Sequence, residues 1–187
     1  EIYGGNNPAD NSGVIKYTQI RFAGSPVRQD EELNGLTLNG VGSGTLIDYV
    51  QVHEGLDDGV EVFGSTVQMK HLVLTNIQDD SLDWTNGWQG RAQFVLIKQA
   101  ATIGDRGIEA DNNEANNDSS PSAQPILSHL KILGRAGDSA TQGVLLRRGT
   151  GANIWNSVIT GSPTCLTIDG AATFANAGVP GSLTGSL

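Results

Sequence analysis

Acidic residues recur at one position of a repeated motif, and they are the side chains of this sequence best suited to chemistry. Glu61, Asp83 and Glu109 each stand between two apolar residues. Turns just before the motif add further carboxylates, namely Asp57, Asp58, Asp79, Asp80 and Asp105. Carboxylate oxygens are preferred ligands of Ca²⁺, and a pair of carboxyl groups is also the usual acid–base machinery of glycoside hydrolysis.

Three interpretations of these acidic residues remain open from the residues alone. Stacked carboxylates about 4.8 Å apart repel each other by roughly 1 kcal/mol per pair in water, so another interaction or role must offset this repulsion. The first is Ca²⁺, with Asp58, Glu61, Asp80, Asp83 and Glu109 as ligands. The second is catalysis by Asp80, Asp83 and Arg106. The third is that turns favour Asp for backbone hydrogen bonds, with Arg106, Arg147 and Arg148 balancing the charge.

The acidic residues belong to a short apolar segment that recurs six times. It occupies residues 35–39, 59–63, 81–85, 107–111, 143–147 and 165–169. Alternation with a period of two predicts strands with one buried face. The first inward column consists of Leu36, Val60, Leu82, Ile108, Val144 and Leu166. The second consists of Leu38, Val62, Trp84, Ala110, Leu146 and Ile168.

A second apolar segment recurs between the copies of the first. It occupies residues 15–20, 47–52, 69–74, 92–97, 127–132 and 154–159. Its first and last residues are apolar in nearly every copy and predict two more inward columns. A further column mixes aromatic and polar residues, and it predicts a stacked ladder of Tyr17, Tyr49, His71, Phe94, His129 and Asn156.

Two short strands per unit cannot bury their faces alone, but stacked units bury them against their neighbours. The sequence therefore predicts an all-β fold, a right-handed parallel β-helix solenoid of about six coils. An antiparallel sandwich would not require the same residue class at the same position of every unit. We expect coils over residues 1–170, a polar insertion at 111–124 that projects from the stack and is dispensable for folding, and a partial further coil or C-terminal extension over 171–187. We also expect the chain to be a fragment of a longer solenoid.

Composition excludes several functional classes. The net charge of −9 disfavours nucleic acid as a partner, because phosphates would be repelled. No run of apolar residues is long enough to predict a membrane-spanning helix. The single cysteine, Cys165, excludes an intrachain disulfide, and the three histidines lack the spacing of a zinc site. Trp84 is expected to face the core. Trp88 is the candidate carbohydrate-binding residue, since it would stack on a sugar ring if it lies exposed beside the acidic positions.

The repeats resemble right-handed parallel β-helix proteins of the pectate-lyase-like type. Residues 34–45, 57–64 and 107–111 are similar to a group of bacterial secreted or cell-surface proteins of this kind. The pair Asp79-Asp80 also resembles the paired aspartates of polygalacturonase-type β-helix hydrolases. Those enzymes complete their site with a His-Gly and an Arg-x-Lys motif, and this chain has neither.

The resemblance implies a secreted or cell-surface location and more than one function. The function that we expect is a surface, structural or adhesion module that binds calcium and glycans, with a polysaccharide or another surface protein as its partner. The alternative is a polysaccharide lyase or glycoside hydrolase that acts on an acidic polysaccharide. Lyase-type elimination needs Ca²⁺ and a basic proton acceptor, and Arg106 is the basic residue beside the acidic positions.

Overall fold

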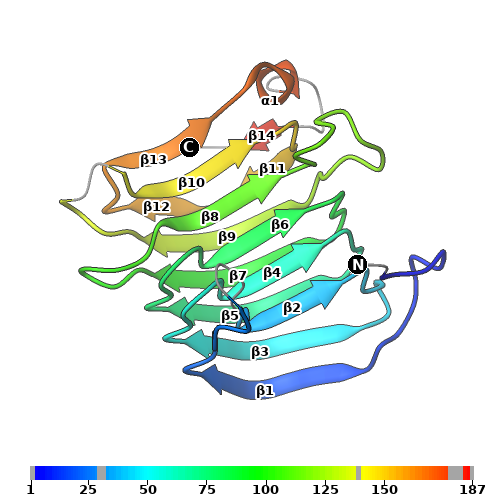
Figure 1. The fold of residues 1–187 in the computed structure, drawn as a ribbon, viewed down its shortest axis with the longest axis horizontal. Coiled ribbons are helices and arrows are strands. Elements are labelled where there is room, and N and C mark those ends of the chain that lie inside the picture. The colour runs from blue at the N-terminus through cyan, green and yellow to red at the C-terminus, as the bar shows by residue number, and fades with distance from the viewer. Residues whose placement is uncertain (1–2, 29–32, 138–139, 177–182, 186–187) are drawn as a thin grey trace.

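The computed structural model describes residues 3–28, 33–137, 140–176 and 183–185. Its strands form two sheets of stacked coils (Figure 1). The long-strand sheet contains β1 (Val14–Arg21), β3 (Leu46–His53), β5 (Gln68–Thr75), β7 (Arg91–Lys98), β9 (Ile126–Leu133), β11 (Ala152–Trp155), β12 (Val158–Thr160) and β14 (Leu183–Gly185). The short-strand sheet contains β2 (Leu36–Asn39), β4 (Val60–Phe63), β6 (Leu82–Thr85), β8 (Arg106–Asp111), β10 (Gln142–Arg147) and β13 (Thr164–Ile168).

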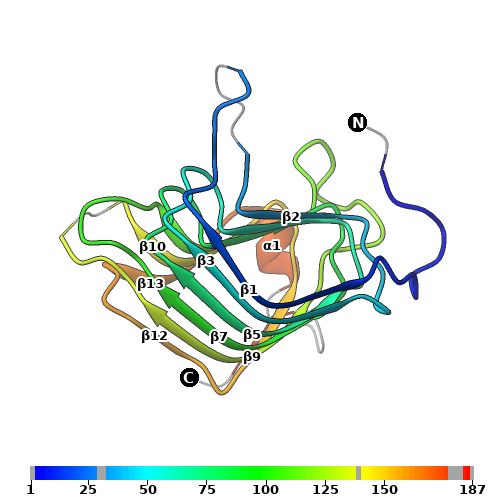
Figure 2. The same ribbon diagram turned by 90° about the horizontal axis from the view of Figure 1, so that it is seen from below.

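Every strand pair is parallel, and the chain alternates between the two sheets. The short-strand sheet has the order β13-β10-β8-β6-β4-β2, and the long-strand sheet begins β1-β3-β5-β7-β9. Each coil therefore contributes one strand to each sheet and pairs with the coils before and after it, as Figure 2 shows along the stack. The predicted parallel β-helix is confirmed.

The predicted inward columns form the core. Val60 pairs in register with Leu82, which pairs with Ile108, and all three side chains are fully buried. Trp84 is also buried, as predicted, and its indole nitrogen donates a hydrogen bond of 3.0 Å to Thr150 Oγ1. Leu166 departs from its column: it lies in β13, at the end of the short-strand sheet, and is 43% exposed.

Each long strand bends at one left-handed residue. Tyr17, Tyr49, His71, Phe94 and His129 have φ values between 51° and 58°, and Asn156 has 49°. The register skips these residues: Lys16 pairs with Asp48, and the next pair is Thr18 with Val50. The bend places two consecutive side chains outside before the next one turns inward. The predicted ladder of these residues is confirmed, and four ring pairs along it lie with centroids 4.2–5.1 Å apart.

The insertion at 111–124 is anchored to the stack through its ends, and its polar tip projects from the stack. Asn112 is 1% exposed, and its amide nitrogen donates hydrogen bonds of 2.9 Å to the carbonyls of Asn117 and Ser119. Its amide oxygen accepts a hydrogen bond from the backbone nitrogen of Ala123, which lies in the core. The polar tip of the loop between these contacts is largely exposed.

After β13 the chain forms one short helix, α1 (Ala171–Asn176), and then β14 pairs with β11 in the long-strand sheet. The other residues of the 171–187 segment lie outside the described part of the chain. No helix in the described ranges is both long enough and apolar enough to cross a membrane.

Candidate functional site: the acidic face

The acidic positions of three coils line up on the outer face of the short-strand sheet. Glu61 in β4 pairs in register with Asp83 in β6, and Asp83 pairs with Glu109 in β8. The residues on either side of each carboxylate point into the core, so the carboxylates point outward. Asp58 and Asp80 lie in the turns that lead into β4 and β6.

These five residues, which we call the acidic cluster, form two overlapping groups. One group is Asp58, Glu61 and Asp83, and the other is Asp80, Asp83 and Glu109. Within each group, one carboxylate oxygen from each residue lies within 4.8 Å of one from each of the other two. The structure thus brings together all five residues that the sequence predicted as calcium ligands, and it places Asp83 in both groups.

Asp58 and Asp80 also connect successive coils. Asp58 Oδ1 accepts a hydrogen bond of 3.1 Å from the backbone nitrogen of Asp80, and Asp80 Oδ1 accepts one of 2.8 Å from the backbone nitrogen of Arg106. Each aspartate uses one oxygen to hold the turn of the next coil. The interpretation that turns select Asp for backbone hydrogen bonds therefore applies to Asp58 and Asp80. It explains only one of the two carboxylate oxygens of each residue.

Arginines compensate one end of the cluster. Arg106 Nη1 lies 2.8 Å from Glu109 Oε2 and 3.8 Å from Asp80 Oδ2. Arg147 bonds the other oxygen of Glu109, and its Nε lies 2.8 Å from Asp111 Oδ1. Arg148 lies farther out, 2.6 Å from Asp111 Oδ2. Glu109 and Asp80 thus have cationic partners from the protein itself.

The other end of the cluster is not compensated in this way. Within the described residues, no Lys or Arg forms a salt bridge with Asp58, Glu61 or Asp83. Asn34 Nδ2 donates a hydrogen bond to Glu61 Oε2. Asp83 Oδ1 is buried and has no hydrogen-bond partner in the described part of the chain. A buried carboxylate oxygen without a partner is costly unless a proton or a cation reaches it.

The pKa values of the cluster reflect this crowding. Burial, with neighbouring carboxylates adding to it, raises the pKa of Asp58 to about 10 and that of Asp80 to about 9. Burial also raises the pKa of Glu61 to about 7, and it raises the pKa of Asp83 well above its ordinary value, with Glu61 and Glu109 contributing. Burial raises the pKa of Glu109 too, although Arg106 and Arg147 oppose it.

The donor set suits a hard cation better than proton abstraction. The Asp58–Glu61–Asp83 group offers only oxygen atoms, which fit Ca²⁺ or Mg²⁺ rather than zinc or copper. Arg106, the predicted base, is surrounded by Asp80, Asp105 and Glu109. The carboxylates of the protein itself therefore already engage its guanidinium group, which leaves Arg106 poorly placed to act as a base.

Trp88 is not a sugar-binding residue, and the prediction for it is wrong. Its side chain is fully buried and packs edge-to-face on Trp84, with ring centroids 5.5 Å apart. Its indole nitrogen donates a hydrogen bond of 3.3 Å to the carbonyl of Val67. An indole without an exposed face cannot stack on a ligand.

Sequence reasoning did not identify Asn34 as a partner of the cluster, or Asp111 as part of the arginine network. Asn34 stands directly before its apolar segment, one coil away from Glu61, and only the stacked register brings the two together. The repeat could have revealed this contact, because Thr37 aligns with Glu61 in the same register.

A search of protein-family models matches residues 1–184 to the pectate-lyase-like β-helix domain. The searches of curated proteins and of solved structures found no significant match. The matched range includes both sheets and all five carboxylates of the acidic cluster. Parallel coils over the same range agree with the family model, and this chain belongs to the pectate-lyase-like β-helix domain family.

Proposed function

We propose that this domain is a module of a secreted or cell-surface bacterial protein, and that it binds Ca²⁺ at the acidic cluster. The ion would neutralise part of the negative charge of the acidic cluster, and this would allow the surface to bind a polysaccharide or another surface protein. The observation that carries the proposal is Asp83 Oδ1, a buried oxygen without a hydrogen-bond partner in the described part of the chain. It belongs to a group of three carboxylates with which no arginine or lysine among the described residues forms a salt bridge.

The Asp58–Glu61–Asp83 group is the part of the cluster that fits a cation best. Glu109 and Asp80 already interact with Arg106, and a second positive charge there would compete with the arginine. Asp58 keeps one oxygen available after bonding the backbone of Asp80. Ca²⁺ commonly completes its shell of about six to eight oxygens with carbonyls and water.

Thermal melting in a calcium titration tests this proposal. Ca²⁺ that binds only the folded state should stabilise it by about 2.7 kcal/mol at about 100 times Kd, and EDTA should reverse the effect. Asp83→Asn should lose most of the calcium response, because the amide keeps the shape but lacks the charge. Asp118→Asn, an exposed carboxylate in the loop, is the matched control and should respond like the original protein. A melting curve that ignores both calcium and EDTA contradicts the proposal.

The second candidate is cleavage of an acidic polysaccharide at the same face, with Asp80, Asp83 and Arg106 in the site. It is favoured by Glu61, whose pKa of about 7 suits a general acid or base near neutral pH and which lies in register with Asp83. An assay for new reducing or unsaturated sugar ends separates the candidates. Under this alternative, Asp83→Asn abolishes turnover and leaves the melting temperature unchanged or raised.

A further inference from the structure

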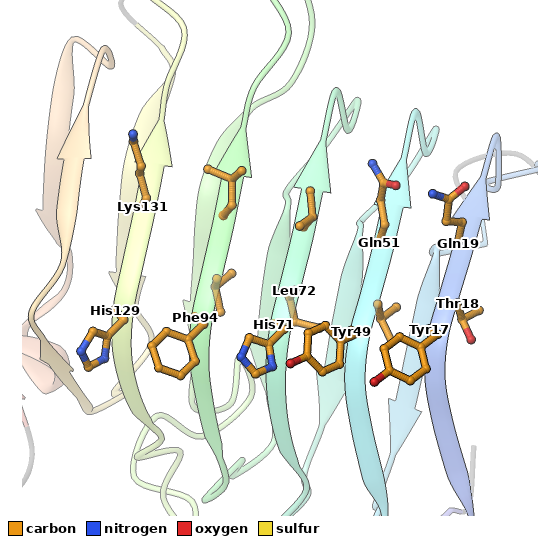
Figure 3. Close-up of a pocket in the computed structure, with 14 residues that line it drawn as sticks. Tyr17, Thr18, Gln19, Tyr49, Gln51, His71, Leu72, Phe94, His129 and Lys131 are labelled. Carbon is orange, nitrogen blue, oxygen red and sulfur yellow. The ribbon is translucent and has the colours of Figure 1, made fainter.

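The outer face of the long-strand sheet carries an aromatic ladder, defined as Tyr17, Tyr49, His71, Phe94 and His129 (Figure 3). Its rings come from five adjacent strands. Tyr49 and His71 are nearly parallel, with centroids 4.2 Å apart, and His71 and Phe94 follow at 5.1 Å. Such centroid separations between near-parallel rings indicate offset stacking, which leaves part of each ring face uncovered.

The rings are exposed although they occupy backbone positions that bulky residues avoid. Tyr17 is 75% exposed, Tyr49 is 44% exposed and Phe94 is 43% exposed. Left-handed positions favour Gly or Asn, and Asn156 occupies the equivalent position in the next coil. A row of aromatic residues at this position is therefore not required by the bend itself. Contiguous exposed apolar surface of this kind is typical of binding sites.

A groove runs beside the ladder across the strands. It has a volume of about 670 Å³. Strands β3 and β5 form its floor at Val50 and Leu72. Its second wall consists of Gln19, Gln51, Val73, Leu96 and Lys131. One wall thus offers ring edges and faces, and the other offers two amides and one ammonium group beside the aliphatic side chains of Val73 and Leu96. This combination suits a ligand with apolar CH faces and many hydroxyl groups.

The face around the groove is basic, although the chain is acidic. Strands β1, β3, β5, β7 and β9 carry six of the 11 Lys and Arg residues and only one of the 20 Asp and Glu residues, Asp48. Their net charge is +5, so the rest of a chain with a total of −9 carries −14. The six basic side chains are exposed, and they are Lys16, Arg21, Lys70, Arg91, Lys98 and Lys131. This charge favours an anionic ligand.

We propose that this face binds an acidic polysaccharide, with the sugar chain lying across the strands along the aromatic ladder. Pyranose CH groups pack on the uncovered ring faces, the amides of Gln19 and Gln51 bond hydroxyl groups, and Lys131 pairs with a carboxylate or sulfate. This proposal adds to the proposed function the class of ligand and the surface that binds it. It rests on the proposed function only in assuming that the domain encounters polysaccharides.

Single-stranded nucleic acid fits this face less well. Binding of unpaired bases relies on rings with an open face for each base. Here neighbouring rings overlap along the ladder, so each ring leaves only part of its face open, which is enough for a CH group but not for a whole base.

Affinity electrophoresis in EDTA tests the proposal without any contribution from calcium. The probes are sodium alginate, carboxyl-reduced alginate as the neutral counterpart, and a single-stranded oligothymidylate. We expect alginate alone to retard the protein. The double variant Tyr49→Asn/Phe94→Asn should weaken the interaction about tenfold or more, while Asn preserves the left-handed backbone. Lys131→Gln should weaken it several-fold and reduce its salt dependence.

Phe22→Asn is the matched control, because Phe22 is also left-handed (φ 58°) and 65% exposed but lies outside the groove. It should bind alginate like the original protein. Four results would overturn the proposal: no retardation by alginate, equal retardation by the neutral polymer, retardation by oligothymidylate alone, or an unaffected double variant. A dimer in light scattering that the double variant converts to a monomer would also overturn it, by assigning the face to self-association. All outcomes are independent of the calcium titration.

Discussion

At the residue scale, each carboxylate of the acidic cluster meets a different demand. Asp58 and Asp80 hold the backbone of the following coil, and Glu109 pairs with two arginines. Asp83 has a buried oxygen to which no group in the described ranges donates a hydrogen bond. The sequence predicted the positions of these residues because they follow the repeat. It could not predict how the arginines distribute among them, because side-chain pairing depends on the packing of neighbouring coils.

The cluster should make the stability of the cation-free protein depend on pH. The folded state keeps protons on Glu61, Asp80 and Asp58 up to pH values of about 7, 9 and 10, whereas the unfolded chain releases them above about pH 4. The free energy of unfolding therefore falls as the pH rises from about 4 towards these values. Melting in EDTA at several pH values should show this decline, and saturating Ca²⁺ should flatten it. A stability that rises over the same range in EDTA would contradict this account.

At the element scale, the alternating pattern was sufficient to place most strands and their register. The bend in each long strand was also encoded, but less visibly. The two inward columns of the long strands are five residues apart along the chain, as in Ile15 and Ile20. In a regular strand, residues separated by an odd number of positions point to opposite faces, so these two could not both point inward. The left-handed residue between them restores the phase. Trp88 was misplaced because it lies in a turn, where no periodicity distinguishes buried from exposed residues.

The register can be tested with one buried charge. Val62 in β4 is fully buried and pairs with Leu38 and Trp84. Val62→Asp should prevent cooperative folding, because an unpaired buried carboxylate costs several kcal/mol against a total stability of about 5–15 kcal/mol. Val158→Asp is the control, since Val158 lies in strand β12 and is 57% exposed. Circular dichroism and melting compare the two. A cooperatively folded Val62→Asp protein would be inconsistent with the register.

The 111–124 loop should depend on one buried amide. Asn112 bonds two carbonyls of the loop and the backbone of Ala123. Asn112→Ala leaves the buried backbone nitrogen of Ala123 without this partner, and it also removes the donor to the two loop carbonyls, so it should lower the free energy of unfolding by about 1–3 kcal/mol. Asn117→Ala, at an exposed position of the same loop, should change it little. Denaturant unfolding measures both, and equal stabilities would show that the loop is held by other contacts.

At the scale of the whole molecule, the two sheets present opposite surfaces. The short-strand sheet carries the acidic cluster, and the long-strand sheet carries most of the basic residues with the aromatic ladder. The total charge of −9 conceals this division. Composition alone suggested an acidic surface and could not separate an acidic face from a basic one, because the fold determines which residues share a face. The family match supports the architecture and leaves the two faces as separate subjects for experiment.

A crystal grown with CaCl₂ and measured at a long X-ray wavelength would reveal whether a cation binds in the acidic cluster. We expect an anomalous peak about 2.3–2.6 Å from oxygens of Asp58, Glu61 and Asp83. The peak should disappear in crystals of Asp83→Asn grown in the same solution. A well-ordered cluster without a peak at saturating calcium, or peaks only elsewhere on the molecule, would contradict the claim.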